Sequence, residues 1–239
     1  MMGKEMNPNR KAAIIVGVLF ITATVASLLS TGFTGSILDA PDYLIKISAN
    51  ENQIIIGALL QFIAAATSAG IAISLYPILR KYNEGLALGS VGFRLIEGVF
   101  YIVSALGKIS LLTLSLEFVK AGTPDASYFQ TLGTLMLAIS NWAGFVFGVI
   151  ASCLGVLMYY YIFYQSKLIP RWLSGWGLIG IVLLLSMALL IMFGEEPSGM
   201  TLLLALPIFL QEMTLAVWLI VKGFNPSAMA SGSAKTDIN

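Results

Sequence analysis

The chain has 239 residues, of which 58% are hydrophobic and only 10% are charged, and its formal net charge is +1. Soluble domains carry about 25% charged residues, so this composition excludes a soluble protein and indicates a polytopic helical membrane protein. A near-neutral chain without a basic surface cluster is also not expected to bind nucleic acid. There is no histidine, and the single cysteine, Cys153, lies inside an apolar run. We therefore expect no metal site, no cofactor and no intrachain disulfide.

Six apolar runs are long enough to cross a bilayer as helices. In chain order they cover residues 12–33, 54–79, 86–118, 128–164, 172–193 and 200–221. Residues 1–11 precede them as a polar tail, residues 12–222 contain the whole transmembrane domain, and residues 223–239 are predicted to be a flexible tail. The predicted fold is an all-α membrane protein, a bundle of six transmembrane helices.

The positive charges of the connecting segments predict the orientation of this bundle. The side of the membrane that holds both termini receives nine Lys and Arg residues, and the opposite side receives only Lys46 and Lys120. The nine are Lys4, Arg10, Lys11, Arg80, Lys81, Lys167, Arg171, Lys222 and Lys235. Because cytoplasmic segments carry the excess of Lys and Arg, we predict that both termini lie in the cytoplasm.

The third apolar run contains charged residues that a membrane helix rarely carries. Residues 92–110 include Arg94, Glu97 and Lys108, although a charge at the centre of a bilayer costs at least about 2.5–3.5 kcal/mol. At about 100° per residue, Arg94, Tyr101 and Lys108 stay within about 40° of one another around the helix. Glu97 falls on the same stripe. The spacing predicts a polar stripe that faces other helices of the bundle.

Further polar residues lie inside the fourth and sixth runs. Glu212 lies near the middle of its run, and Glu97 and Asn141 reach similar depths from the ends of theirs. Pro207, inside the sixth run, should kink the helix one turn before Gln211. We therefore predict a ligand site near the midplane of the membrane. Its predicted residues are Arg94, Glu97, Tyr101, Lys108, Asn141, Gln211 and Glu212.

Simpler interpretations of the same residues stay open at this stage. Arg94 and Lys108 could extend their side chains to the headgroups on either side of the membrane. Arg94 and Glu97 could form an ion pair that only fastens the bundle. Asn141 and Gln211 could make hydrogen bonds between helices without touching a ligand.

Two stretches give the chain a family resemblance. They are GFRLIEGVFYIV at residues 92–103 and SKLIPRWLSGWGLIGIVLLL at residues 166–185. Both resemble an uncharacterised bacterial family of multi-pass membrane proteins, known as domain of unknown function 4386. The resemblance covers about residues 9–222. It implies a bacterial cytoplasmic membrane and no defined activity.

Three classes of function fit these observations. A protein that binds or carries a small molecule or a lipid-like ligand accounts best for a charged cluster at the midplane. A membrane enzyme could use Glu97 or Glu212 as general acid or base, although the sequence has no nucleophile motif and no catalytic residue is assigned. A structural or regulatory membrane subunit would need no ligand. The lipid bilayer is the one partner that all three share.

Overall fold

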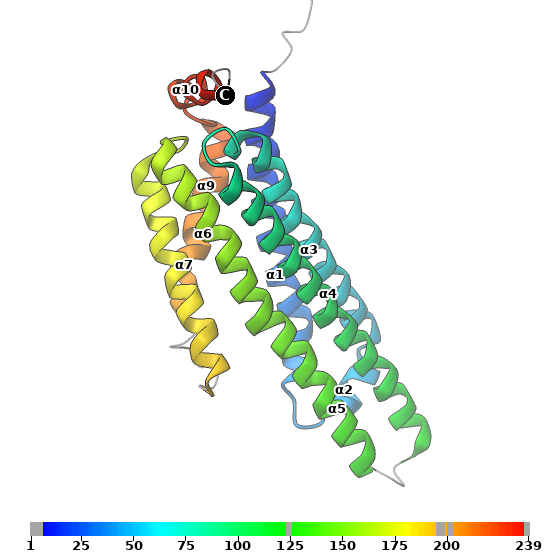
Figure 1. The fold of residues 1–239 in the computed structure, drawn as a ribbon. Helices are drawn as coiled ribbons and strands as arrows, with labels where there is room; N and C mark the ends of the chain where they lie inside the picture. Colours follow the sequence, from blue (N-terminus) through cyan, green and yellow to red (C-terminus); the bar gives the residue numbers. More distant parts are fainter. Residues whose placement is uncertain (1–6, 123–125, 195–198, 200–202, 237–239) are drawn as a thin grey trace, which may run out of the picture.

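The computed structural model describes residues 7–122, 126–194, 199 and 203–236, and it is helical in nearly all of them (Figure 1). The first four helices are α1 (Pro8–Leu38), α2 (Tyr43–Ala49), α3 (Glu51–Leu79) and α4 (Glu84–Ala121). One continuous rod follows, made of α5 (Ala126–Asn141), the π-helix η1 (Trp142–Gly148) and α6 (Val149–Ser166). The chain ends with α7 (Arg171–Met192), the short 3-10 helix η2 (Leu203–Ala205), α9 (Leu206–Val221) and α10 (Pro226–Thr236).

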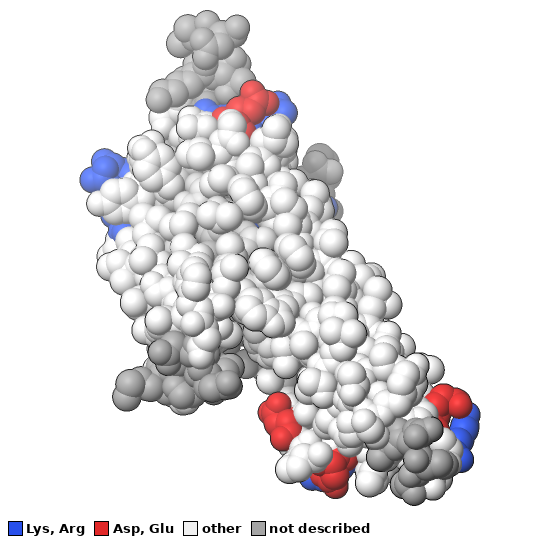
Figure 2. Space-filling view, turned by 60° about the horizontal axis from the view of Figure 1, so that its bottom comes forward, with Lys and Arg blue, Asp and Glu red and all other residues white. Residues whose placement is uncertain are grey.

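Six of these helical rods are long and apolar enough to cross a membrane, which confirms the predicted all-α six-helix membrane fold. Figure 2 shows the same division on the surface: charged side chains gather at the two ends of the face in view, and the wide band between them is almost uncharged. The two ends of the described chain lie at the same end of the bundle (Figure 1). The starting residues of the sixth predicted run, 200–202, lie outside the described residues.

The segments between and after the predicted runs hold additional helices. The segment between the first two runs folds into α2, whose residues Tyr43, Leu44 and Ile47 are buried. Residues 223–239 were predicted as a flexible tail, and the structure places 226–236 in α10. Phe224, just before α10, and Met229 within it are buried, and the Tyr82 hydroxyl donates a hydrogen bond to the carbonyl of Ala228, which links α10 to the bundle.

Pro207 lies at the start of a helix and not in a helix interior, where its position in the sixth run predicts it. The structure places it in the first turn of α9, directly after the 3-10 turn Leu203–Ala205. A proline is well tolerated there, since the first amides of a helix have no intrahelical acceptor and its fixed φ suits the helix start. The predicted kink one turn before Gln211 is therefore wrong, and the helix begins at that place instead.

The apolar core is divided into two parts. The first core lies at the end that holds both termini, and its largest fully buried side chains include Phe20, Tyr159 and Phe163. The second core lies at the opposite end, where α2 packs against α4 around Leu44 and Leu111. Between them the buried face of α4 has no large apolar side chain. It consists of Ser90, Arg94, Glu97, Gly98, Ser104, Ala105 and Lys108.

α1 and α9 approach closely at one end. The Arg10 guanidinium donates hydrogen bonds to the last carbonyls of α9, those of Leu219, Ile220 and Val221. These carbonyls have no partner within the helix, so a cation there is favourable. Nearby, a Cβ on Gly17 would lie 2.8 Å from the carbonyl oxygen of Ala216, so only glycine permits this approach. The two helices are thus fixed together near the termini.

Candidate functional site

Arg94 and Glu97 form an ion pair inside the bundle. Arg94 Nη1 lies 2.8 Å from Glu97 Oε2, and the same nitrogen donates a 2.8 Å hydrogen bond to Ser152 Oγ of α6. Both side chains are buried, with 6% and 3% of their surface exposed. Arg94 therefore does not extend to the headgroups. Its partner is Glu97, one turn along the same helix.

This ion pair lies on the wall of a cavity of about 210 Å³. The polar wall consists mainly of Ser68, Arg94, Glu97, Tyr101, Ser152 and Glu212. The opposite walls are largely apolar, with Ile181 and Leu184 from α7 and Ile208 and Phe209 from α9. Ser27 and Leu28 of α1 also line the cavity and are exposed on the surface of the bundle. The cavity therefore has one charged side, one apolar side and an edge at the surface next to α1.

The charged groups of the cavity lie deep within the bundle. At 1.5 Å per residue, Arg94 is about 15 Å from the start of α4, and Glu212 is about 14 Å from the end of α9. A hydrocarbon core is about 30 Å thick, so both residues are at roughly half its depth. This is the depth that the sequence pattern predicts for the site.

Glu212 differs from Glu97 in its surroundings. Among the described residues it has neither an ion-pair partner nor a hydrogen-bond partner, and its side chain keeps intermediate exposure where Glu97 is buried. It lies close enough to Arg94 and Glu97 for all three charges to interact. Because Arg94 is already paired with Glu97, Glu212 gives the cavity one acidic group in excess.

One buried donor on the same wall, Arg94 Nε, also lacks a hydrogen bond within the described part of the chain. A buried polar atom without a partner costs free energy comparable to that of a lost hydrogen bond. The wall therefore has both donor and acceptor capacity for a molecule in the cavity.

The predicted site residues divide into two groups. The structure brings Arg94, Glu97, Tyr101 and Glu212 together on the cavity. Lys108 lies farther along α4 and is buried, with Nζ 3.5 Å from Ser30 Oγ, so it extends neither to this cavity nor to the headgroups.

The other two predicted site residues, Asn141 and Gln211, lie away from the cavity. Asn141 is exposed at the end of α5. Gln211 is fully buried but turned away, since it accepts a hydrogen bond from the Tyr160 hydroxyl and donates one of 3.0 Å to the carbonyl of Leu173. Its role here is a link between helices.

Ser152 and the π-helix η1 are parts of the site that the sequence analysis missed. A Cβ on Gly148, the last residue of η1, would lie 2.8 Å from the Tyr101 ring, so the missing side chain lets Tyr101 pack tightly beside the cavity. A usable signal was present in the small residues Ser140, Gly144, Gly148 and Ser152, which recur every four positions. Such spacing allows close contact between membrane helices, and irregular π segments are frequent near functional sites.

The fold and this site define a polytopic helical membrane protein with a charged cavity inside the bundle. The chain belongs to the family described as domain of unknown function 4386, whose model matches residues 15–223. No curated protein and no solved structure matches the chain. Among the described residues, no three His, Cys, Asp or Glu side chains are grouped so that they could hold a metal ion.

Proposed function

We propose that this protein binds, and carries within the membrane, a small ligand held in the cavity between α1, α4 and α9. The observation that supports this most strongly is Glu212, a carboxylate at mid-membrane depth that lines the cavity without a partner among the described residues. A charged residue at such a depth is costly, and one that faces a cavity marks a site of function by default.

The charges and the size of the cavity suggest the chemical class of the ligand. With Arg94 and Glu97 paired, the excess acidic group favours a ligand that carries a cationic or strongly hydrogen-bond-donating group. Sites for drug-sized ligands measure about 300–1,000 Å³, so a cavity of about 210 Å³ suits a smaller molecule. The apolar wall of Ile181, Leu184 and Phe209 accommodates a short hydrocarbon part. A small alkylamine has all these properties.

This proposal can be tested by thermal unfolding of the purified protein in detergent. Hexylamine should raise the midpoint of unfolding, whereas hexanoate and hexanol, with chains of the same length, should not. A ligand at one hundred times its dissociation constant stabilises the folded state by about 2.7 kcal/mol. The shift should disappear in Glu212→Gln and persist in Glu117→Gln, an exposed glutamate at the far end of α4. Equal shifts with all three compounds, or an unchanged shift in Glu212→Gln, would contradict the proposal.

We also propose that the protein lies in the cytoplasmic membrane of a bacterium with both termini in the cytoplasm. The excess of Lys and Arg on the side of the termini supports the orientation. Single cysteines at Glu51 and Glu117, in a Cys153→Ser background, should react with an impermeant thiol reagent added to whole cells. A cysteine at Lys167 should react only in inside-out vesicles. The reverse pattern would overturn the orientation.

A further inference from the structure

A second cavity, of about 470 Å³, lies at the end of the bundle that holds both termini. It forms where the turn between α6 and α7 meets the end of α9. Two hydrogen bonds hold these segments together: Asn225 N donates to the carbonyl of Leu168 at 2.9 Å, and Asn225 Nδ2 donates to that of Lys167 at 3.3 Å. This junction is far from Glu212 along α9, so the cavity is separate from the one described above.

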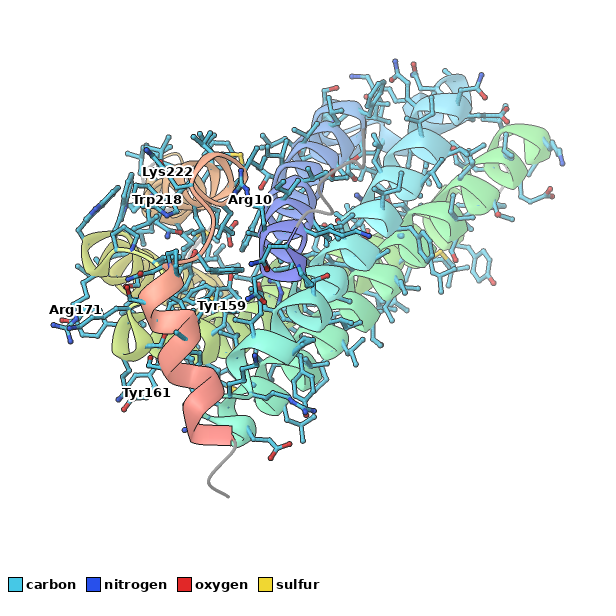
Figure 3. The ribbon with its side chains drawn as sticks, turned by 90° about the horizontal axis from the view of Figure 1, so that it is seen from above. Arg10, Tyr159, Tyr161, Arg171, Trp218 and Lys222 are labelled. Carbon is cyan, nitrogen blue, oxygen red and sulfur yellow. The ribbon has the colours of Figure 1, made fainter. Side chains whose placement is uncertain are left out.

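Three cations surround this second cavity. Lys167, Arg171 and Lys222 line it, all three are exposed, and no carboxylate is among its described lining residues. None of the three forms an ion pair within the described part of the chain. Viewed from above, Arg171, Trp218 and Lys222 lie on the same side of the bundle (Figure 3). The positive charge here is therefore available to an anion.

The backbone at the start of α7 also favours an anion in this cavity. Arg171 is the first residue of α7, a helix of 22 residues whose N-cap, Pro170, supplies no side-chain hydrogen bond. The first amides of a helix carry a partial positive charge and bind phosphate or carboxylate groups readily. The N-terminus of α7 and the three basic side chains thus face the same cavity.

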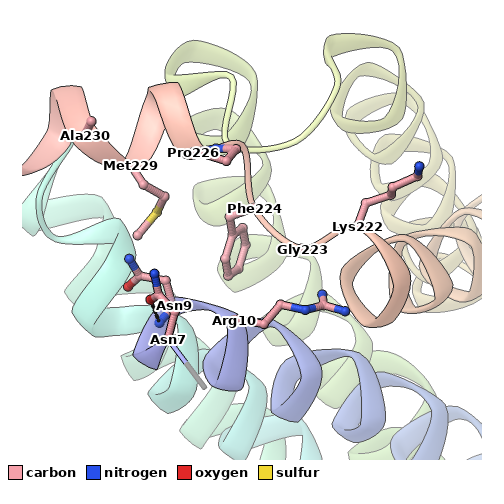
Figure 4. A pocket seen from close by; sticks show the side chains of 9 residues that line it. All are labelled: Asn7, Asn9, Arg10, Lys222, Gly223, Phe224, Pro226, Met229 and Ala230. Carbon is pink, nitrogen blue, oxygen red and sulfur yellow. Dashed lines mark hydrogen bonds between the residues drawn. The ribbon is translucent and has the colours of Figure 1, made fainter. Parts of the chain in front are cut away.

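Arg10 is not available to bind an anion in this cavity. Figure 4 shows its side chain directed at the end of α9, where it binds the last carbonyls, while Lys222 extends away from it. The basic cavity therefore depends on Lys167, Arg171 and Lys222.

An apolar groove continues from the basic cavity along α9. It is lined by Met213, Thr214, Val217, Trp218, Val221 and Lys222, and it shares Trp218 and Lys222 with the basic cavity. Val217 and Val221 are exposed, so this face of α9 is not covered by another described helix. Trp218 and Trp172 form an edge-to-face pair with ring centroids 6.5 Å apart, and tryptophans of this kind mark the headgroup level of a membrane. The groove thus runs from the headgroup level toward the hydrocarbon.

We propose that these two surfaces together bind one anionic phospholipid. The phosphate head lies among Lys167, Arg171 and Lys222 at the start of α7, and one acyl chain lies in the groove beside Val217. Charge complementarity selects this occupant, because an uncharged or zwitterionic lipid would gain less from three cations without a carboxylate. Basic pockets between helices on the cytoplasmic side are suited to anionic headgroups.

Native mass spectrometry of the purified protein with added lipid tests this proposal. The protein should retain phosphatidylglycerol in preference to phosphatidylcholine with the same acyl chains. Arg171→Gln/Lys222→Gln should weaken phosphatidylglycerol binding by about 25-fold, since each basic side chain near anionic lipid contributes about a factor of five.

Lys11→Gln/Arg80→Gln is the matched control. It removes the same charge from the same end of the protein, and Arg80 stacks on Tyr76 as Arg171 stacks on Tyr164. The control should bind the lipid as the wild type does. Equal weakening by both double variants would show that only the overall surface charge attracts the lipid, and would overturn the proposal. Equal retention of phosphatidylglycerol and phosphatidylcholine would overturn it as well. Val217→Gln should also weaken phosphatidylglycerol binding. An unchanged affinity would show that the acyl chain does not lie in the groove. Glu212→Gln should leave lipid binding intact, which separates this result from the test of the first cavity.

Discussion

Two stretches of α4 carry charge on the same stripe, yet their surroundings differ. Around Arg94 the stripe meets Ser152 of α6 and faces a cavity that Glu212 lines from α9. Around Lys108 it meets packed side chains, where Lys108 Nζ lies 3.5 Å from Ser30 Oγ. Figure 1 shows α7 and α9 toward the end of the bundle that holds the termini, whereas α4 continues beyond them toward the opposite end.

This difference shows that a polar stripe forms a site only where the neighbouring helices leave space. α9 is held to α1 near the termini by Arg10 and by the close approach at Gly17. About three turns farther along α1, Ser27 and Leu28 line the cavity instead of packing against α9. The charged cavity therefore depends on where α1 and α9 separate, and the charge pattern of α4 alone does not determine it.

The largest effect should come from separating Arg94 from Glu97. Glu97→Gln leaves a buried guanidinium without its carboxylate, which should lower the free energy of unfolding by about 3–5 kcal/mol. Arg94→Met/Glu97→Gln should recover most of that loss, because both charges are gone. Dodecyl sulfate titration of the wild type, Glu97→Gln, Arg94→Met and the double variant in mixed micelles would measure the coupling. Additive losses in the double variant would mean that the ion pair contributes nothing.

A smaller effect should follow from filling the space between η1 and α4. In Gly148→Ala the new methyl group would lie 2.8 Å from the Tyr101 ring, and such overpacking costs about 1–3 kcal/mol. Gly92→Ala is the control on α4, since a Cβ there meets nothing within 4 Å. The same titration should show a loss for Gly148→Ala alone. Equal stability of the two variants would show that Tyr101 is not held by this contact.

The smallest effect is expected at the second charged stretch. Lys108→Met removes a buried cation that has no carboxylate partner among the described residues, and Met has a similar shape. Replacing such a charge with an apolar residue is often neutral or stabilising, so we expect a gain of about 1 kcal/mol. A loss of several kcal/mol would show that Lys108 has an essential partner, and would make the two stretches of α4 alike.

The sequence could predict the helices and part of the cavity. Uninterrupted apolar runs define the six membrane helices, and the seven-residue spacing places Arg94 and Tyr101 on one face. The sequence could not show which of the other polar residues face the same side as Glu212. Gln211 is adjacent in sequence, but successive residues point about 100° apart around a helix, so Gln211 turns toward Tyr160. Asn141 was predicted as a site residue from its depth in the membrane, and depth does not determine which way a side chain faces.

Glu212 is an accessible carboxylate without a partner among the described residues, whereas Glu97 is buried in an ion pair. This difference can be tested with dicyclohexylcarbodiimide, which modifies protonated carboxyl groups in apolar surroundings, by treating native membranes and analysing the peptides by mass spectrometry. We expect Glu212 but not Glu97 to react, and the unmodified Glu212 peptide to disappear more slowly with hexylamine than with hexanol. No reaction at Glu212, or equal rates with the two compounds, would show that Glu212 does not bind an alkylamine in an accessible cavity.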